Sequence, residues 1–123
     1  MKRSDAFLLI AYAVCLSFGQ ILFKYSAKNL TDRPCGISCL VDRLANSASF
    51  WFAVTIYGLL TLFWVWILSR VSLVTAYPFV ALCFVLVPAM SWVAFGERVG
   101  GAYVLGTILI LAGLGLIFME VGK

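Results

Sequence analysis

The chain has 123 residues, of which 64% are hydrophobic and only 11% are charged, with a net charge of +4 and a mean hydropathy of +1.09. A soluble domain is typically about 45–50% apolar and about 25% charged, so this composition excludes a water-soluble fold. The sequence has no histidine and no clustered pair of carboxylates. We therefore expect no enzymatic activity, no cofactor and no bound metal. The small, scattered positive charge suits contact with membrane lipids and argues against a nucleic-acid partner.

Four stretches of the chain contain no Asp, Glu, Lys or Arg. They are Ala6–Phe23, Phe50–Ser69, Val71–Gly96 and Val99–Met119. About 20 helical residues cross a hydrocarbon layer of roughly 30 Å, and each stretch is close to that length or longer. We predict an all-α membrane protein made of a single four-helix domain over residues 1–123. The expected spans are residues 5–27, 50–69, 73–95 and 101–119.

The first apolar stretch follows two basic residues, Lys2 and Arg3, as in a secretory signal peptide. It is longer than a usual signal core, and no small-residue cleavage site follows it, so we expect it to remain as a membrane helix. Polar side chains occur near its end at helical spacing. Ser17, Gln20, Lys24 and Lys28 follow one another at steps of three, four and four. They share one helix face, where polar groups in a membrane usually meet a cavity, a partner helix or the headgroup layer.

The first loop contains a pattern that is typical of a short amphipathic helix. Ile37, Leu40, Val41 and Leu44 recur at i, i+3, i+4 and i+7. We expect this segment to lie on the membrane surface, the alternative being an irregular loop with a few apolar anchors. Cys35 and Cys39 share the same loop, and their separation permits a disulfide in an oxidising compartment without requiring one.

The later spans carry several residues of interest. In the second span, Tyr57 and Thr61 share a face that either lines a cavity or simply packs, and Arg70 follows it at headgroup level. In the third span, Pro88 lies deep in the helix and is a candidate hinge. Glu97, in the tight connection to the last span, is expected to have a structural role as a helix cap or as the partner of a cation.

The last span has a face of small residues. Ala102, Gly106 and Gly113 lie on it. Small residues allow helix backbones to approach closely, so we expect a packing face there, within one subunit or between two.

Several motifs resemble the drug/metabolite transporter superfamily. They are Ala76-Tyr77-Pro78-Phe79, Phe84-Val85-Leu86-Val87-Pro88 and Phe95-Gly96-Glu97-Arg98. The glycines of the last span, with Leu109-Ile110 and Ala112-Gly113, resemble the dimer motif of its small multidrug resistance branch. That branch uses a carboxylate in its first helix to couple protons to cations, but the matching position here is Leu16. Without a titratable group at this position, proton-coupled export of a cation lacks its central residue.

A second branch fits better. The Gly19-Gln20 pair and the later Lys24 are similar to the small subunits that flip aminoarabinose-phosphoundecaprenol across the bacterial inner membrane. This resemblance implies a multi-pass inner-membrane flippase subunit for a polyprenyl-phosphate-linked sugar or a similar anionic lipid. It also implies a homodimer, or a heterodimer with a related small subunit. The alternatives are a small multidrug resistance-type exporter of cations or polyamines, and an accessory membrane subunit of a glycosyltransferase system.

Within this hypothesis, we assign substrate-binding roles to six side chains. Lys24 and Arg70 are expected to attract the phosphate, and Gln20, Ser17, Tyr57 and Thr61 to form hydrogen bonds with the headgroup. For Lys24, an ordinary anchor at a helix end is the competing interpretation. The dimer is expected to pack through Ala102, Gly106 and Gly113.

Overall fold

A computed structural model of the chain describes residues 3–28 and 36–121 and contains six helices in this part. They are α1 (Arg3–Lys28), α2 (Ile37–Ala45), α3 (Ala48–Leu68), α4 (Leu73–Val80), α5 (Cys83–Phe95) and α6 (Gly101–Val121). Four helical stretches are long and apolar enough to cross a membrane: Ser4–Lys28, Ala48–Leu68, Leu73–Phe95 and Gly101–Glu120. The prediction of an all-α membrane protein with four spans is therefore confirmed.

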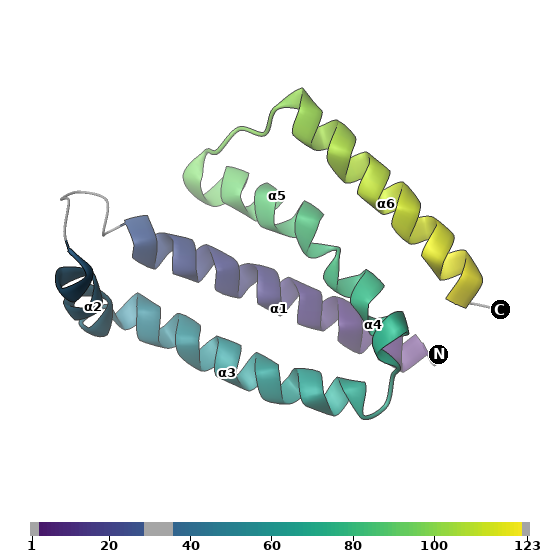
Figure 1. Cartoon of the computed structure of the whole chain (residues 1–123), viewed down its shortest axis with the longest axis horizontal. Coiled ribbons are helices and arrows are strands. Elements are labelled where there is room, and N and C mark those ends of the chain that lie inside the picture. Colours follow the sequence, from purple (N-terminus) through teal and green to yellow (C-terminus); the bar gives the residue numbers. More distant parts are fainter. Residues whose placement is uncertain (1–2, 29–35, 122–123) are drawn as a thin grey trace.

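Helix α1 lies at the centre of the molecule, with α3 on one side and α4 and α5 on the other (Figure 1). Its contacts with these helices account for most of the tertiary packing. The buried cluster contains Leu9, Tyr12, Leu60, Ile67, Ala76 and Phe79. It lies beside the N-terminal half of α1, and the Tyr12 ring stacks on Trp64 with 4.7 Å between ring centroids. The other half of α1 therefore has fewer buried neighbours, and it is there that a cavity opens.

The third span is divided into two helices. Between α4 and α5, the backbone at Ala81 and Leu82 forms tighter i→i−3 hydrogen bonds, including Leu82 N to Phe79 O at 3.1 Å. Helix α5 continues through Pro88, so the interruption lies earlier in the span than the proline we singled out as a hinge. A hinge at Pro88 remains a prediction.

The short helix expected in the first loop is present as α2. Its apolar side chains are open: Ile37 is 83% exposed and Val41 57% exposed. An amphipathic helix with an uncovered apolar face is suited to the membrane surface. Cys35 lies outside the described residues, so its pairing with Cys39 stays a prediction.

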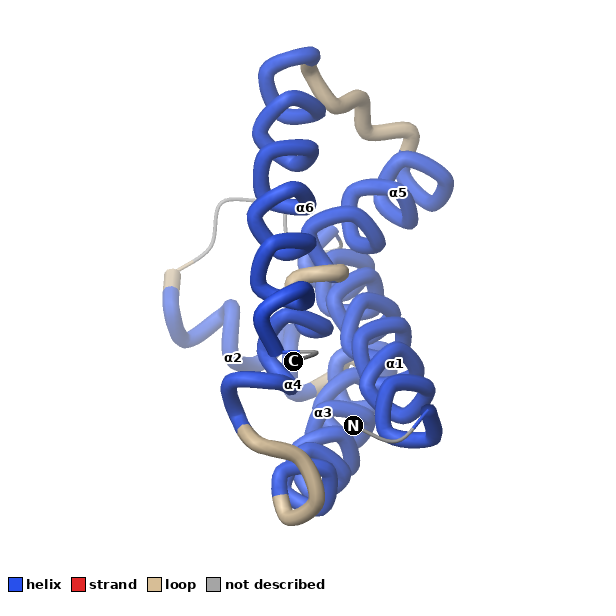
Figure 2. The backbone as a smooth tube through the Cα atoms, turned by 90° about the vertical axis from the view of Figure 1, so that its right-hand side faces the viewer, coloured by secondary structure: helices blue, strands red, loops and turns tan. Residues whose placement is uncertain are grey.

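Helix α6 is the least buried of the four spans. Figure 2 shows residues 96–100 carrying the chain from the end of α5 across to the start of α6. Gly96 begins this connection in the left-handed region (φ 69°, ψ 19°), and its N–H donates to the Trp92 carbonyl at 2.9 Å. At its other end α6 packs on α4, where the rings of Phe79 and Phe118 meet edge to face with 4.9 Å between centroids. The last span is therefore tied to the bundle mainly near its C-terminal end.

Candidate functional site: a charged cavity beside the first helix

A cavity of about 760 Å³ opens between the C-terminal half of α1, helix α5 and the start of α6. It is lined by Gln20, Ile21, Phe23, Lys24, Ala27, Val87, Pro88, Ser91, Glu97, Arg98, Val99 and Tyr103. Gln20, Lys24 and Ala27 lie on one face of α1 because they follow one another at steps of four and three. Two residues of the polar face predicted from the sequence, Gln20 and Lys24, thus lie on the α1 side of this cavity.

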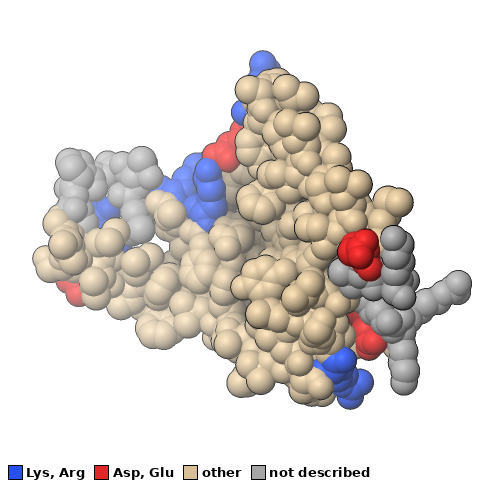
Figure 3. Space-filling model, turned by 45° about the vertical axis from the view of Figure 1, so that its right-hand side comes forward, with Lys and Arg blue, Asp and Glu red and all other residues tan. Residues whose placement is uncertain are grey.

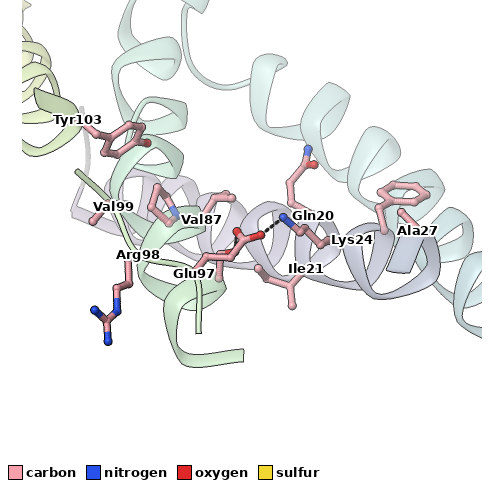
Figure 4. Close-up of a pocket in the computed structure, with 12 residues that line it drawn as sticks. Gln20, Ile21, Lys24, Ala27, Val87, Glu97, Arg98, Val99 and Tyr103 are labelled. Atoms are coloured by element: carbon pink, nitrogen blue, oxygen red, sulfur yellow. Dashed lines mark hydrogen bonds and ion pairs between the residues drawn. The ribbon is translucent and has the colours of Figure 1, made fainter. Parts of the chain in front are cut away.

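An ion pair crosses the cavity. The Lys24 ammonium on α1 pairs with the Glu97 carboxylate, which lies in the connection between α5 and α6 (Figure 4). The second oxygen of Glu97 accepts a hydrogen bond from the hydroxyl of Ser91, which is only 6% exposed. The left-handed turn at Gly96 brings Glu97 back over the end of α5. Two segments that are far apart in the chain are therefore joined through opposite charges.

Both charged groups remain accessible. The Lys24 side chain is 49% exposed and the Glu97 side chain 46% exposed. The hydrogen bonds from Lys24 and Ser91 lower the pKa of the Glu97 carboxyl below its usual value, so it is ionised at neutral pH. Arg98 also lines the cavity, but its guanidinium points away from the Lys24–Glu97 pair (Figure 4). A site with both signs of charge is suited to a ligand that has a phosphate and an amine.

Charged atoms on the face shown in Figure 3 are gathered toward opposite ends of the molecule, with uncharged surface between them. One group, where basic and acidic atoms adjoin, lies in a hollow of the surface. The charged cavity is thus a polar site beside apolar helices that face the membrane.

The structure brings together only two of the six predicted substrate-binding side chains, Gln20 and Lys24. Ser17 is fully buried and its hydroxyl donates to the Ala13 carbonyl at 2.8 Å. Thr61 is exposed on α3, and its hydroxyl donates to the Tyr57 carbonyl at 2.8 Å. Both hydroxyls therefore use their proton within their own helix.

Tyr57 and Arg70 also lie away from the cavity. The Tyr57 ring packs on α1 beside Gly19 and Phe23, and its hydroxyl is buried without a hydrogen-bond partner among the described residues. The Arg70 guanidinium lies 4.0 Å from the Trp66 ring centroid, where α3 ends beside the start of α1 (Figure 1). It is at the opposite end of α1 from Lys24.

Four polar cavity residues did not belong to the predicted substrate set: Ser91, Glu97, Arg98 and Tyr103. Glu97 pairs with a cation, which is one of the two structural roles expected for it, but that cation is the predicted phosphate ligand Lys24. In the sequence, the charged residues Glu97 and Arg98 next to an apolar span were a signal for a functional site. The partner of Glu97, Lys24, is 73 residues away and was not visible in any local spacing.

Tyr103 has a second role beside Pro88. A proline has no N–H, so the Phe84 carbonyl four residues earlier loses its helical donor. The Tyr103 hydroxyl donates to that carbonyl at 3.0 Å. Backbone groups freed in a membrane helix need such a partner, and here α6 supplies it to α5.

The predicted dimer face on α6 is open in the single chain. A Cβ atom added at Gly106 or Gly113 would meet nothing within 4 Å, and Ala102 is exposed. Packing of a second subunit on this face remains a prediction.

Comparison with known proteins shows relatives that match along most of their length. A probable 4-amino-4-deoxy-L-arabinose-phosphoundecaprenol flippase subunit ArnE from Pseudomonas aeruginosa is 40% identical over 92% of this chain and 96% of the relative. Proteins of the same description from Pseudomonas syringae pv. syringae and Pseudomonas savastanoi pv. phaseolicola are 31% and 30% identical, over 86% and 87% of this chain and 94% and 90% of the relatives. No protein-family profile and no solved structure matches the chain.

Proposed function

The chain belongs to the ArnE family of flippase subunits, and from this premise we propose that it is one subunit of a flippase for a polyprenyl-phosphate-linked amino sugar. The relatives are named for a lipid that joins a phosphate, an aminated sugar and a long polyprenyl chain. The observation that carries the proposal is the Lys24–Glu97 ion pair in an open cavity beside apolar helices. Its two charges match the two charges of such a headgroup.

The Lys24 ammonium binds the phosphate, and the Glu97 carboxylate binds the sugar ammonium. Moving a charged headgroup through hydrocarbon is costly when either charge loses its partner. In the free protein Lys24 and Glu97 neutralise each other. A bound headgroup replaces this pair with two new pairs, so no charge is left alone, and Gln20 offers its amide to the sugar hydroxyls.

We also propose that the protein functions in the bacterial inner membrane, as a transporter subunit rather than an enzyme. The relatives are named as subunits, which implies a partner chain. A second subunit, identical or related, is proposed to pack on the α6 face of Ala102, Gly106 and Gly113, which is open in this chain. Such a subunit supplies the other wall that four helices alone cannot provide.

Transport by proteoliposomes tests this function. The purified protein, with any subunit that copurifies, is reconstituted with aminoarabinose-phosphoundecaprenol. The arrival of the amine in the outer leaflet is then followed with a membrane-impermeant amine reagent. Lys24→Ala is expected to lower the initial rate about tenfold, because a charge-assisted hydrogen bond contributes about 1.5–3 kcal/mol.

Lys28→Ala is the matched control, because Lys28 is exposed near the end of the same helix and does not line the cavity. It should flip the lipid at the wild-type rate. An unchanged rate in the Lys24→Ala protein would remove Lys24, and with it the ion-pair mechanism, from transport.

A further inference from the structure

A second cavity adjoins the charged one and has the opposite character. It is a groove of about 330 Å³ between α5 and α6, with Val85, Ala89 and Trp92 on one wall and Val104, Ile108 and Leu111 on the other. Its two polar residues, Tyr103 and Thr107, donate their hydroxyls to the carbonyls of Phe84 and Tyr103 at 3.0 Å each. The groove therefore presents an apolar surface.

The two cavities share part of their lining. Pro88, Val99 and Tyr103 belong to both the charged cavity and the apolar groove. The Tyr103 side chain, drawn in Figure 4, lies at this boundary. Its hydroxyl donates to the Phe84 carbonyl. A single ligand with a polar end and an apolar end can therefore occupy both without leaving the protein surface.

The position of α6 keeps the groove open. Near its start, α6 is tied to α5 by the Tyr103 hydrogen bond, and near its end it is tied to α4 by the Phe118 ring on Phe79. Between these two contacts, side chains such as Val104 and Ile108 are 45% and 55% exposed. The groove is thus a side opening toward the membrane.

We propose that this groove holds the first isoprene units of the substrate's polyprenyl chain while its headgroup lies in the charged cavity. The inference rests on the proposed function and adds the site of the tail. A pocket of about 330 Å³ is near the lower end of the roughly 300–1,000 Å³ found for small-molecule sites. It accommodates only the part of the chain nearest the phosphate, and the remainder stays in the lipid.

Photocrosslinking of the full-length protein tests the occupant. p-Benzoyl-phenylalanine is placed at position 108, which lines the groove, or at position 105, which is exposed on the same helix but lines neither cavity. After illumination in membranes that contain polyprenyl-phosphate amino sugar, the adducts are identified by mass spectrometry. We expect polyprenyl adducts at position 108 and at most a background level at position 105. Equal labelling, phospholipid adducts in their place, or a crosslink to a second copy of α6 would overturn the proposal.

A binding experiment separates the tail site from the headgroup site. Ile108→Trp fills the groove, with Leu105→Trp as the control, because Leu105 is exposed on the same helix and lines neither cavity. The ligands are the full-length lipid and a water-soluble analogue in which a methyl group replaces the whole polyprenyl chain. We expect Ile108→Trp to weaken binding of the full-length lipid about tenfold and to change binding of the analogue less than threefold, whereas Leu105→Trp changes neither.

An unchanged affinity of Ile108→Trp for the full-length lipid, while the analogue still binds, would overturn the tail site alone. Failure of the wild-type protein to bind either ligand would overturn the proposed function as well. The Ile108→Trp protein must keep the helical content and the chromatographic elution of the wild-type protein. A loss of binding then does not result from a loss of fold.

Discussion

At the residue scale, Gly19 marks a close approach between α1 and α3. A Cβ atom at this position would lie 2.5 Å from Cε2 of the Tyr57 ring. That ring is held by Phe23, with 4.9 Å between the ring centroids, so it has little room to move. Glycine is required here by the space available, since the backbone is ordinary helix.

We therefore expect Gly19→Ala to lower the free energy of unfolding by about 1–3 kcal/mol through overpacking, even though alanine is the better helix former. Gly58→Ala is the control, because a Cβ atom there meets nothing within 4 Å. It should be neutral or mildly stabilising. The measurement is reversible unfolding in mixed micelles, and Tyr57→Ala should reduce the cost of Gly19→Ala. If Gly19→Ala were as harmless as Gly58→Ala, the close packing of α1 on α3 would be wrong.

The polar face of α1 shows how well residue spacing predicts which side chains line a site. The steps of three and four correctly placed Gln20 and Lys24 on a common face, and both line the charged cavity. The same steps also included Ser17, which is buried and donates to its own helix. Helical periodicity gives the direction of a side chain. It does not tell whether a neighbouring helix covers that direction.

At the element scale, α5 depends on α6 for one of its backbone hydrogen bonds. Pro88 leaves the Phe84 carbonyl without a helical donor, and the Tyr103 hydroxyl replaces it at 3.0 Å. A carbonyl that a proline frees deep in a membrane span needs another donor. The sequence did not indicate which of the neighbouring hydroxyls would serve, because that depends on where α6 crosses α5.

A double-mutant cycle tests this dependence. Tyr103→Phe should lower the free energy of unfolding by about 1–3 kcal/mol, because it leaves the Phe84 carbonyl without a partner. In a Pro88→Ala background the backbone N–H of residue 88 can donate to that carbonyl, so the same change should cost much less. Unfolding in mixed micelles provides the four free energies. An equal cost of Tyr103→Phe in both backgrounds would contradict the assigned role of the hydroxyl.

At the scale of the whole molecule, composition was sufficient to predict four membrane spans, because uncharged stretches of this length have no other stable solution in a chain so apolar. The arrangement of those spans was not predictable in the same way. Membrane helices are apolar on all sides, so their sequences carry little information about which faces meet. The Lys24–Glu97 pair joins residues 73 positions apart and exists only because α5 packs on α1.

The interruption between α4 and α5 was missed for a related reason. The run from Leu73 to Phe95 has the composition of a continuous helix. Of its two prolines, Pro88 was the predicted hinge. The backbone instead forms the tighter i→i−3 hydrogen bonds at Ala81 and Leu82. Neither residue is a glycine or a proline, so neither predicted a break in the helix. Tertiary packing can therefore place a break where local propensity does not.

The central claim is that the cavity beside α1 binds a headgroup of two opposite charges, with Glu97 holding the amine. Native mass spectrometry with equimolar aminoarabinose-phosphoundecaprenol and undecaprenyl phosphate measures this preference directly. The wild-type protein should retain the aminated lipid about tenfold more than undecaprenyl phosphate. Glu97→Gln should abolish that preference while keeping the phosphate lipid bound through Lys24. Glu120→Gln, which makes the same charge change outside the cavity, should preserve it. Equal retention of the two lipids by the wild-type protein, or an undiminished preference in Glu97→Gln, would contradict the account.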